Sequence, residues 1–211
     1  MCGILGIIKN DVAQHLDKAL DKISHRGPDS FGTFIHGDLG LGHRRLSIID
    51  LSENGKQPMI SECGNFILVF NGEIYNHLDV RVKLEYKYTF KSHSDTETLL
   101  YGFIEFGENV LNMLNGIFAF SIFNKVTNEL FIARDQFGIK PLYYYCDANL
   151  FWFSSEIKAI LPFEIDTEID KPALVNYLTF LYSPAEKTPF KKVHKLLPGH
   201  FIKLNITDYQ N

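Results

Sequence analysis

The second residue of the chain, Cys2, has a chemical option that no interior cysteine has. If Met1 is removed, Cys2 becomes the N-terminal residue and carries a thiol and a free α-amine on adjacent carbons. Their ordinary pKa values, about 8.5 for the thiol and about 8 for the amine, are nearly matched, so the amine can accept the thiol proton near neutral pH. While Met1 is present, the same nitrogen is an amide and is not a base. A chance cysteine at position 2 is the alternative, and this residue alone favours it.

A second candidate is the tripeptide Asn71-Gly72-Glu73, which directly follows the apolar run from Phe66 to Phe70. We expect this run to be a strand, and its end would bring the Asn71 side-chain amide and the Gly72 N–H toward one point. Two such donors form an oxyanion hole, which stabilises the negative oxygen of a tetrahedral intermediate. Read by itself, the tripeptide is equally typical of a tight turn between two strands.

Two charged residues, Arg45 and Asp95, have side chains suited to a charged substrate. An arginine can hold a carboxylate through two parallel hydrogen bonds, although a single Arg in a strand is usually a surface residue. Asp95 follows Ser94 at the start of a helix predicted over 95–106, where it is most simply an N-cap or first-turn acid. A carboxylate at that place is also able to bind a substrate ammonium. Taken singly, both residues favour the structural interpretation.

The elements that would position these residues are strands and helices in alternation. The chain has 211 residues, of which 45% are apolar and 22% charged, a composition typical of a folded globular domain. Its 18 Phe and ten Tyr favour packed sheets over a small helical bundle. Hydrophobic spacing and turn residues predict a strand over 3–8, a helix over 12–23, and a hairpin of 31–36 with 39–44 around Gly37-Asp38.

Three further predicted strands, at 117–123, 142–145 and 151–153, are apolar on both faces. Such a strand has to be covered on both sides, whereas the strands of a plain two-sheet sandwich alternate between apolar and polar residues. The pattern therefore predicts two stacked sheets with helices outside them.

The character of the sequence changes after residue 160, where an acidic run is followed by a basic one. We expect residues 1–160 to form the main domain and residues 161–211 to complete it and act as a connector. Two elements are predicted in this part: a short helix over 172–181 and a last hairpin over 193–204, broken at Pro198-Gly199.

Charge and cysteine usage exclude several classes of protein. The net charge of −4 argues against a dedicated nucleic-acid binder, which normally has a basic face. No run approaches 18 apolar residues, so no membrane partner is expected, and the N-terminus lacks the features of a secretory signal, which makes the cytoplasm the expected location. The three cysteines, at positions 2, 63 and 146, include no close pair and predict neither a disulfide framework nor a metal site.

Together, the candidate residues belong to a series of motifs that resembles the glutaminase domain of class II glutamine amidotransferases, above all its asparagine synthetase branch. The motifs occur in the same order and at comparable intervals, and they cover nearly the whole chain. Arg-Gly-Pro-Asp and Arg-Leu-Ser-Ile separate this branch from the sugar-phosphate and purine-pathway amidotransferases. The matching stretches are Met1 to Ile4, His25 to Asp29, Gly42 to Leu51 with Gln57-Pro58, Phe70 to Asn76, Ser94 to Glu97, Gly116 to Phe120, Ala133 to Asp135 with Phe137 to Tyr144, and Phe153 to Ala159.

The resemblance implies an N-terminal-nucleophile hydrolase fold, an α+β sandwich of four layers (αββα) with two stacked antiparallel sheets between helices. It also implies a glutaminase. Cys2 would attack the side-chain carboxamide of glutamine, Asn71 and Gly72 would stabilise the oxyanion, and water would hydrolyse the γ-glutamyl thioester. Ammonia and glutamate would be the products.

The same resemblance implies how glutamine is held. Arg45 would bind its α-carboxylate with help from backbone groups of Ile48 and Ile49, while Glu73 and Asp95 would receive its α-ammonium. No metal takes part. The complete implied set of glutamine-binding residues is Arg45, Leu46, Ser47, Ile48, Ile49, Asn71, Gly72, Glu73 and Asp95.

Full members of that family carry a second, ATP-dependent domain that activates aspartate and receives the ammonia. This sequence has no phosphate loop of the Ser-Gly-Gly-x-Asp-Ser kind. We therefore expect no cofactor in this domain, with ATP and Mg²⁺ bound only by a synthetase partner in cis or in trans. A homodimer is also left open.

Three alternatives stay open. The ammonia acceptor can differ from aspartate, for example a sugar acid or a peptide carboxylate, because the glutaminase half would look the same. A non-catalytic docking domain is the second, and retention of Cys2, Arg45, Asn71, Gly72 and Asp95 together argues against it. A metal or lipid site at Cys2 is the third, and it lacks a second cysteine or a lipoprotein signal.

Overall fold

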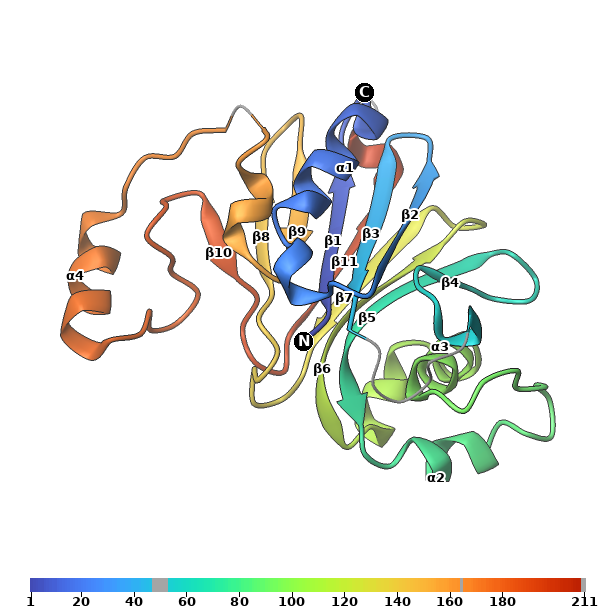
Figure 1. Ribbon diagram of the computed structural model, residues 1–211. Coiled ribbons are helices and arrows are strands. Elements are labelled where there is room, and N and C mark those ends of the chain that lie inside the picture. The colour runs from blue at the N-terminus through green and yellow to red at the C-terminus, as the bar shows by residue number, and fades with distance from the viewer. Residues whose placement is uncertain (47–52, 164, 210–211) are drawn as a thin grey trace.

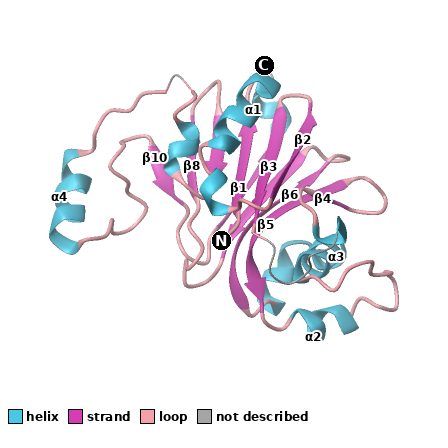
Figure 2. Ribbon diagram, in the orientation of Figure 1, coloured by secondary structure: helices cyan, strands magenta, loops and turns pink. Residues whose placement is uncertain are grey.

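The computed structural model describes residues 1–46, 53–163 and 165–209, and Figure 1 traces their path. Two antiparallel sheets form the centre of the molecule (Figure 2). The first has the strand order β10-β8-β9-β1-β3-β2 and the second has the order β11-β7-β6-β5-β4. The strands are β1 (Gly3–Ile8), β2 (Ser30–His36), β3 (Leu39–Arg45), β4 (Met59–Ile60), β5 (Phe66–Ile74), β6 (Gly116–Asn124), β7 (Glu129–Arg134), β8 (Tyr143–Cys146), β9 (Phe151–Ser154), β10 (Val193–Lys195) and β11 (Phe201–Asn205).

Helices cover the outer faces of both sheets, and most of them are short. The α-helices are α1 (Val12–Asp21), α2 (His77–Val82), α3 (Asp95–Phe106) and α4 (Lys171–Phe180). Short 3-10 helices occupy Ser24–Arg26, Glu53–Gly55, Gly107–Met113, Ile157–Ile160 and Ile206–Tyr209. No helix in the described part of the chain is long and apolar enough to span a membrane.

Three apolar layers lie between these elements, and strands β1 and β5 each contribute to two of them. In β1, Ile4 packs into the space between the sheets and Leu5 packs against α1. In β5, Val69 faces the space between the sheets and Leu68 faces the layer under α3. Each fully buried side chain of this size stabilises the fold by about 1.5–3 kcal/mol relative to exposure. The predicted α+β architecture of two stacked sheets with outer helices is confirmed.

Local sequence signals explain where several elements begin and turn. The hydroxyl of Ser94 accepts a hydrogen bond from the Glu97 N–H and starts α3. The carboxylate of Asp170 accepts the Ala173 N–H and starts α4. The β2–β3 hairpin turns at Gly37, whose φ of 57° is in the left-handed region that favours glycine. These elements agree with the sequence predictions.

The predicted last hairpin over 193–204 is wrong. Strand β10 pairs with β8 in the first sheet, whereas β11 pairs with β7 in the second, so the two strands never meet. The chain crosses between the sheets at Pro198-Gly199, where the Gly199 N–H donates to the Asp135 carbonyl at 2.9 Å. Strand β8 of the first sheet pairs with β10, and strand β7 of the second sheet pairs with β11. In the sequence, a turn and a crossing between sheets both appear as one apolar run broken at Pro198-Gly199, so the pattern does not distinguish them.

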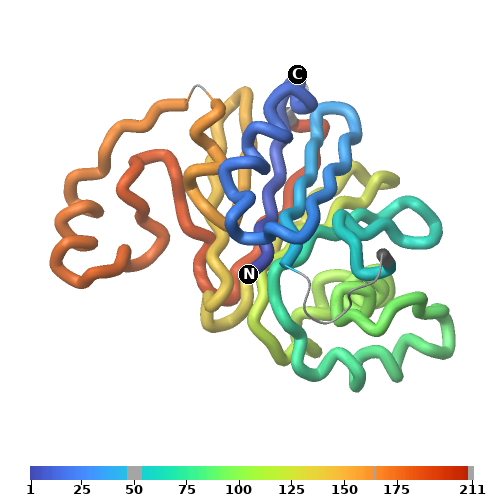
Figure 3. The backbone as a smooth tube through the Cα atoms, viewed as in Figure 1, coloured from blue at the N-terminus to red at the C-terminus, as the bar shows by residue number. Residues whose placement is uncertain are grey.

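The helix α4 lies away from the two sheets on an extended excursion of the chain (Figure 3). Ion pairs join the two arms of this excursion, with Lys187 Nζ 3.1 Å from Asp170 and Lys192 Nζ 3.2 Å from Asp166. The chain then returns to the body through β10 and β11, so residues beyond 160 complete both sheets.

Candidate active site

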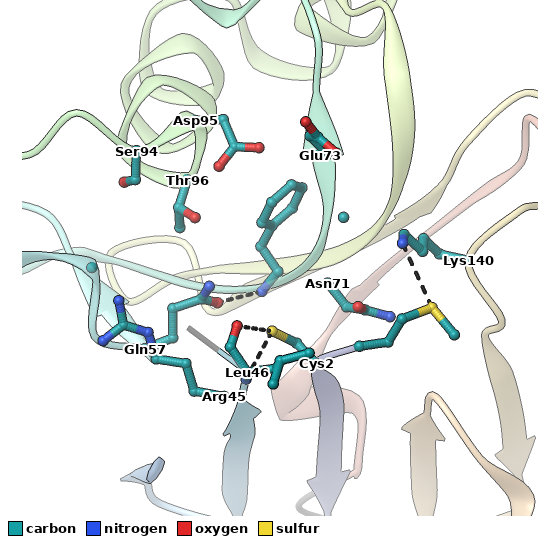
Figure 4. Close-up of a pocket in the computed structure, with 14 residues that line it drawn as sticks. Cys2, Arg45, Leu46, Gln57, Asn71, Glu73, Ser94, Asp95, Thr96 and Lys140 are labelled. Carbon is teal, nitrogen blue, oxygen red and sulfur yellow. Dashed lines mark hydrogen bonds between the residues drawn. The ribbon is translucent and has the colours of Figure 1, made fainter. Parts of the chain in front are cut away.

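The predicted site residues converge on one cleft of about 140 Å³ at the end of the sheets where β1 begins (Figure 4). This volume suits a small polar molecule rather than a macromolecule. Ser47, Ile48 and Ile49, three of the predicted glutamine-binding residues, lie outside the described residues. The cleft is lined by Met1, Cys2, Arg45, Leu46, Gly55, Gln57, Phe70, Asn71, Gly72, Glu73, Ser94, Asp95, Thr96 and Lys140.

The thiol of Cys2 faces the first residue after β3. Its Sγ accepts a hydrogen bond from the Leu46 N–H at 3.4 Å and lies 3.6 Å from the Leu46 carbonyl oxygen, to which the thiol proton can be donated. Met1 is attached and mostly exposed, with its Sδ 3.7 Å from Lys140 Nζ. The nitrogen of Cys2 is therefore an amide in this chain, and removal of Met1 would convert it to an amine inside the cleft.

The tripeptide Asn71-Gly72-Glu73 lies inside strand β5, so neither the expected strand end nor the tight turn is present. The β5–β6 register places Gly72 opposite Phe118. The Phe118 N–H and carbonyl oxygen are bonded to Asp135, at 3.2 and 2.8 Å, on the far side of β6. Because main-chain groups alternate in an antiparallel pair, the N–H and carbonyl of Gly72 face away from β6 and toward the cleft.

Strand β4 covers only the first part of β5, and side chains take its place beyond Phe70. The Phe70 N–H donates to Gln57 Oε1 at 2.6 Å, and the Phe70 carbonyl lies 3.1 Å from His43 Nε2. The Ile74 N–H donates to Asp95 Oδ2 at 2.9 Å. Between these held groups, the main chain of Gly72 is left facing the cleft.

Residue 72 has to be a glycine because the two strands approach closely there. A Cβ at this position would lie 2.4 Å from the Ile117 carbonyl oxygen and 2.7 Å from the Phe118 Cα, both of which are backbone atoms. Any side chain would therefore push β5 away from β6 and move the N–H that faces the cleft.

Asn71 supplies a second donor. Its side chain is only 2% exposed, and its Nδ2 has no hydrogen-bond partner among the described residues. A buried amide without a partner costs free energy, and such groups in native proteins call for an explanation such as a ligand. Figure 4 shows the amide beside Cys2. The Asn71 amide and the Gly72 N–H together suit a negatively charged oxygen bound next to the thiol.

Negative groups lie across the cleft from Cys2, on β5 and α3 (Figure 4). Asp95 is 3% exposed, and burial raises the pKa of its carboxyl although the Ile74 N–H opposes the rise. Glu73 lines the same side of the cleft. Arg45, half-buried at the end of β3, contributes a positive group to the lining of the cleft. The cleft thus offers a thiol, hydrogen-bond donors and charges of both signs.

A family model of the glutamine amidotransferase domain matches residues 1–211. The chain belongs to this family. It is 45% identical over 207 residues to glutamine-hydrolyzing asparagine synthetase 1 of Bacillus subtilis, a match that covers 94% of the chain and 33% of the relative. It is 39% identical over 220 residues to a putative glutamine-hydrolyzing asparagine synthetase 2 of Methanocaldococcus jannaschii, covering 93% and 42%. The amidotransferase domain therefore spans less than half the length of these relatives.

The solved structure of glutamine phosphoribosylpyrophosphate amidotransferase from Bacillus subtilis, complexed with ADP and GMP, has the same fold. The TM-score is 0.63 at 23% identity, over 75% of this chain and 43% of that one. The resemblance read from the sequence motifs is confirmed for the amidotransferase family, for its fold and for the asparagine synthetase branch among the relatives.

The amidotransferase domain fixes the backbone of Cys2 through Arg26, a residue that is not among the predicted site residues. Arg26 Nε donates to the Cys2 carbonyl at 2.9 Å, and its Nη1 lies 3.0 Å from Glu156. His25 also contacts Glu156, at 2.8 Å. Burial opposes ionisation of Glu156, but hydrogen bonds from Arg26 and His25 outweigh it and lower the pKa of the carboxyl. The signal was present in the sequence, since His25, Arg26 and Glu156 belong to the family motifs.

The amidotransferase domain buries a neutral histidine, His43, and this predicts acid sensitivity. Burial lowers the pKa of His43 from 6.5 to about 3. Below pH 6.5, His43 binds a proton in the unfolded chain but not in the folded chain. The contribution of His43 to the free energy of unfolding is therefore fully present above that pH and is lost as the pH falls toward 3. The loss amounts to about 5 kcal/mol at the lower limit. We expect the thermal midpoint of His43→Gln to fall less steeply than that of the wild type between pH 6.5 and 4. Equal slopes would contradict the assignment.

Within residues 1–46, 53–163 and 165–209, no three His, Cys, Asp or Glu side chains are close enough together to hold a metal ion. The other two cysteines of the amidotransferase domain, Cys63 and Cys146, are exposed and do not line the cleft.

Proposed function

We propose that this domain hydrolyses L-glutamine to glutamate and ammonia, with Cys2 as the nucleophile after removal of Met1. One observation carries the proposal: the thiol of residue 2 shares a cleft with a buried amide, Asn71 Nδ2, that has no partner among the described residues. The family model and the names of the relatives agree with this reaction.

The proposed reaction balances with groups in the cleft. The free α-amine of Cys2 takes the thiol proton, and Sγ forms a bond to the carboxamide carbon of glutamine. The carbonyl oxygen becomes negative and binds the Asn71 amide and the Gly72 N–H. When the tetrahedral intermediate collapses, the C–N bond breaks and the α-ammonium of Cys2 protonates the leaving nitrogen, releasing ammonia. Water, deprotonated by the same amine, then hydrolyses the thioester to glutamate.

Charges in the cleft suit the two ends of the glutamine backbone. We propose that Arg45 binds the α-carboxylate and that Glu73 and Asp95 bind the α-ammonium, since the acids line the side of the cleft opposite Cys2. The predicted contribution of Leu46 through Ile49 stays a prediction, because only Leu46 is described and its main chain contacts the Cys2 sulfur.

Glutamine binding is expected to weaken as the pH falls, because protonation of Asp95 removes a negative partner of the α-ammonium. Burial raises the pKa of Asp95, so this loss begins at a higher pH than for an ordinary carboxyl. Asp95→Asn keeps an oxygen for the Ile74 N–H and loses the charge. We expect it to raise KM by about 10–100-fold at neutral pH and to flatten the rise in KM that the wild type shows as the pH falls. An unchanged KM would remove Asp95 from the substrate site.

The proposed function is tested by incubating the Met-free protein with L-glutamine and measuring glutamate and ammonia separately. Intact mass gives the fraction that has lost Met1. We expect equal amounts of both products and little turnover of L-asparagine, whose carboxamide carbon is one methylene closer to the charged ends held across the cleft. No glutamate from a Met-free, folded sample would reject the proposal for the domain in isolation.

We further propose that the ammonia serves ATP-dependent asparagine synthesis from aspartate in a synthetase partner, in cis or in trans. The support is that both relatives cited above are named glutamine-hydrolyzing asparagine synthetases and extend well beyond the matched region. ATP and Mg²⁺ would bind in that partner and not in this domain. Homodimer formation and a cytoplasmic location stay predictions.

A further inference from the structure

We propose that His43 is a positioning residue, which holds the Phe70 carbonyl and thereby aims the donors of Asn71 and Gly72 at the reacting oxygen. The proposal rests on the proposed glutaminase function and adds to it a residue outside the cleft lining. His43 lies on β3 opposite Ile4 of β1, two residues before Arg45. Its imidazole reaches across the space between the sheets to β5.

The contact is a fully buried hydrogen bond. His43 has no exposed surface, and its Nε2 lies 3.1 Å from the Phe70 carbonyl oxygen. Because burial lowers the pKa of His43 to about 3, the ring is neutral at working pH and carries one proton. A carbonyl oxygen only accepts, so that proton is on Nε2. The other nitrogen, Nδ1, has no partner among the described residues, so the Phe70 contact is the bond that orients the ring there.

The bonded carbonyl belongs to the peptide that leads into Asn71. The opposite edge of that peptide faces β6, where Asn71 pairs with Ala119. On the edge toward the cleft, the pairing with β4 does not extend as far as Phe70. His43 supplies the bond that a neighbouring strand would otherwise give. The orientation of this peptide sets the direction of the Asn71 side chain and of the Gly72 N–H that follows.

The same bond has an electrostatic effect. A carbonyl oxygen carries a partial negative charge, and on this edge it is the neighbour of the Gly72 N–H. If it rotated toward the cleft, it would repel the negative oxygen that the donors are proposed to stabilise. The Nε2–H of His43 holds it back and offsets its charge. Such an effect acts on the transition state far more than on bound glutamine, and it therefore belongs in kcat rather than KM.

Two amide variants separate this role from simple filling of space. His43→Gln places an N–H donor four bonds from Cα, as far as Nε2, whereas His43→Asn places it three bonds from Cα, where Nδ1 lies. At about pH 8 we expect His43→Asn to lower kcat by about 10–100-fold, with KM changed by less than about threefold. We expect the kcat of His43→Gln to be close to that of the wild type. Thermal midpoints of both variants are measured in the same buffer.

A second measurement reads the oxyanion site directly. The γ-aldehyde analogue of glutamine adds the Cys2 thiol to its carbonyl carbon, and the thiol proton ends on the oxygen or is released if that oxygen stays anionic between the donors. We expect His43→Asn to weaken inhibition by this aldehyde by about the same factor as it lowers kcat. Binding of L-glutamate, which makes no such adduct, is expected to change little.

Failure of this proposal differs from failure of the proposed function. A wild-type protein that releases no glutamate rejects the function itself. A wild-type protein that is active beside folded Gln and Asn variants of equal kcat, whether both high or both low, rejects the positioning role. The positioning role is also rejected if the whole fall in kcat/KM of His43→Asn comes from a higher KM.

Discussion

Glutamate release from L-glutamine is expected to fall by about 10⁴-fold or more when Cys2 is replaced by alanine. The Cys2 thiol lines the same cleft as Asn71, and the other two cysteines do not line it. The hydrogen bonds of the Cys2 sulfur within the described part of the chain are to the main chain of Leu46, so the variant breaks no side-chain hydrogen bond there. Rates of glutamate formation at saturating glutamine, with the thermal midpoint as a folding control, measure the effect.

The matched control keeps the thiol and removes the amine. A one-residue extension in front of Cys2, confirmed by intact mass, leaves its nitrogen as an amide, as it is while Met1 remains attached. We expect this protein to be nearly as inactive as Cys2→Ala, although a thiol reagent still titrates three cysteines. Full activity with a blocked amine would show that another group accepts the thiol proton, and activity in Cys2→Ala would show a different nucleophile.

Replacing Asn71 by alanine is expected to lower kcat by about 10²–10³-fold with little change in KM. The amide is buried and its Nδ2 has no partner among the described residues, so alanine removes a donor without breaking a contact that supports the fold. The domain is therefore expected to stay as stable as the wild type or to gain stability, because an unsatisfied buried group is lost. Steady-state kinetics and thermal unfolding measure both effects.

Asn71→Asp gives the sharper comparison. It keeps the size of the side chain and exchanges the donor for a negative oxygen, which would repel the developing charge. We expect its kcat to be lower than that of Asn71→Ala at pH 8 and to recover partly when the carboxyl is protonated. If both variants retain more than about a tenth of the wild-type kcat, Asn71 is not an oxyanion donor and its buried amide requires another explanation.

Much of the architecture could be predicted from the sequence because its signals are local. The cap at Ser94 and the turn at Gly37 agree with the structure. The two-residue β4 and the strand β7 went unpredicted, since a run as short as Met59–Ile60 has no periodicity and depends on pairing with β5. The sequence predicts a hairpin at Pro198-Gly199 because a hairpin and a crossing between sheets give the same local pattern.

The cleft residues were predictable to a different extent. Cys2, Arg45, Asn71, Gly72 and Asp95 have chemistry that stands out along the chain, and the cleft brings all of them together. His43 and Gln57 look ordinary in the sequence. They matter because the pairing with β4 does not reach Phe70, so their side chains bond its main chain instead. His43 and Gln57 are 27 and 13 residues away from Phe70 in the sequence. Such a register is set by the whole sheet and has no local signature.

The early end of β4 also bears on how this protein avoids aggregation. A strand with an open edge is a template on which another chain can add, and β5 is nine residues long and begins with five apolar residues. Along this edge, side chains bond the main chain of β5: Gln57 and His43 bond that of Phe70, and Asp95 bonds that of Ile74. Within the residues that the structure describes, only the backbone of Gly72 is left between them, and one residue is too short a stretch for a strand to pair with. The gap in the sheet therefore admits a small molecule and excludes a second polypeptide.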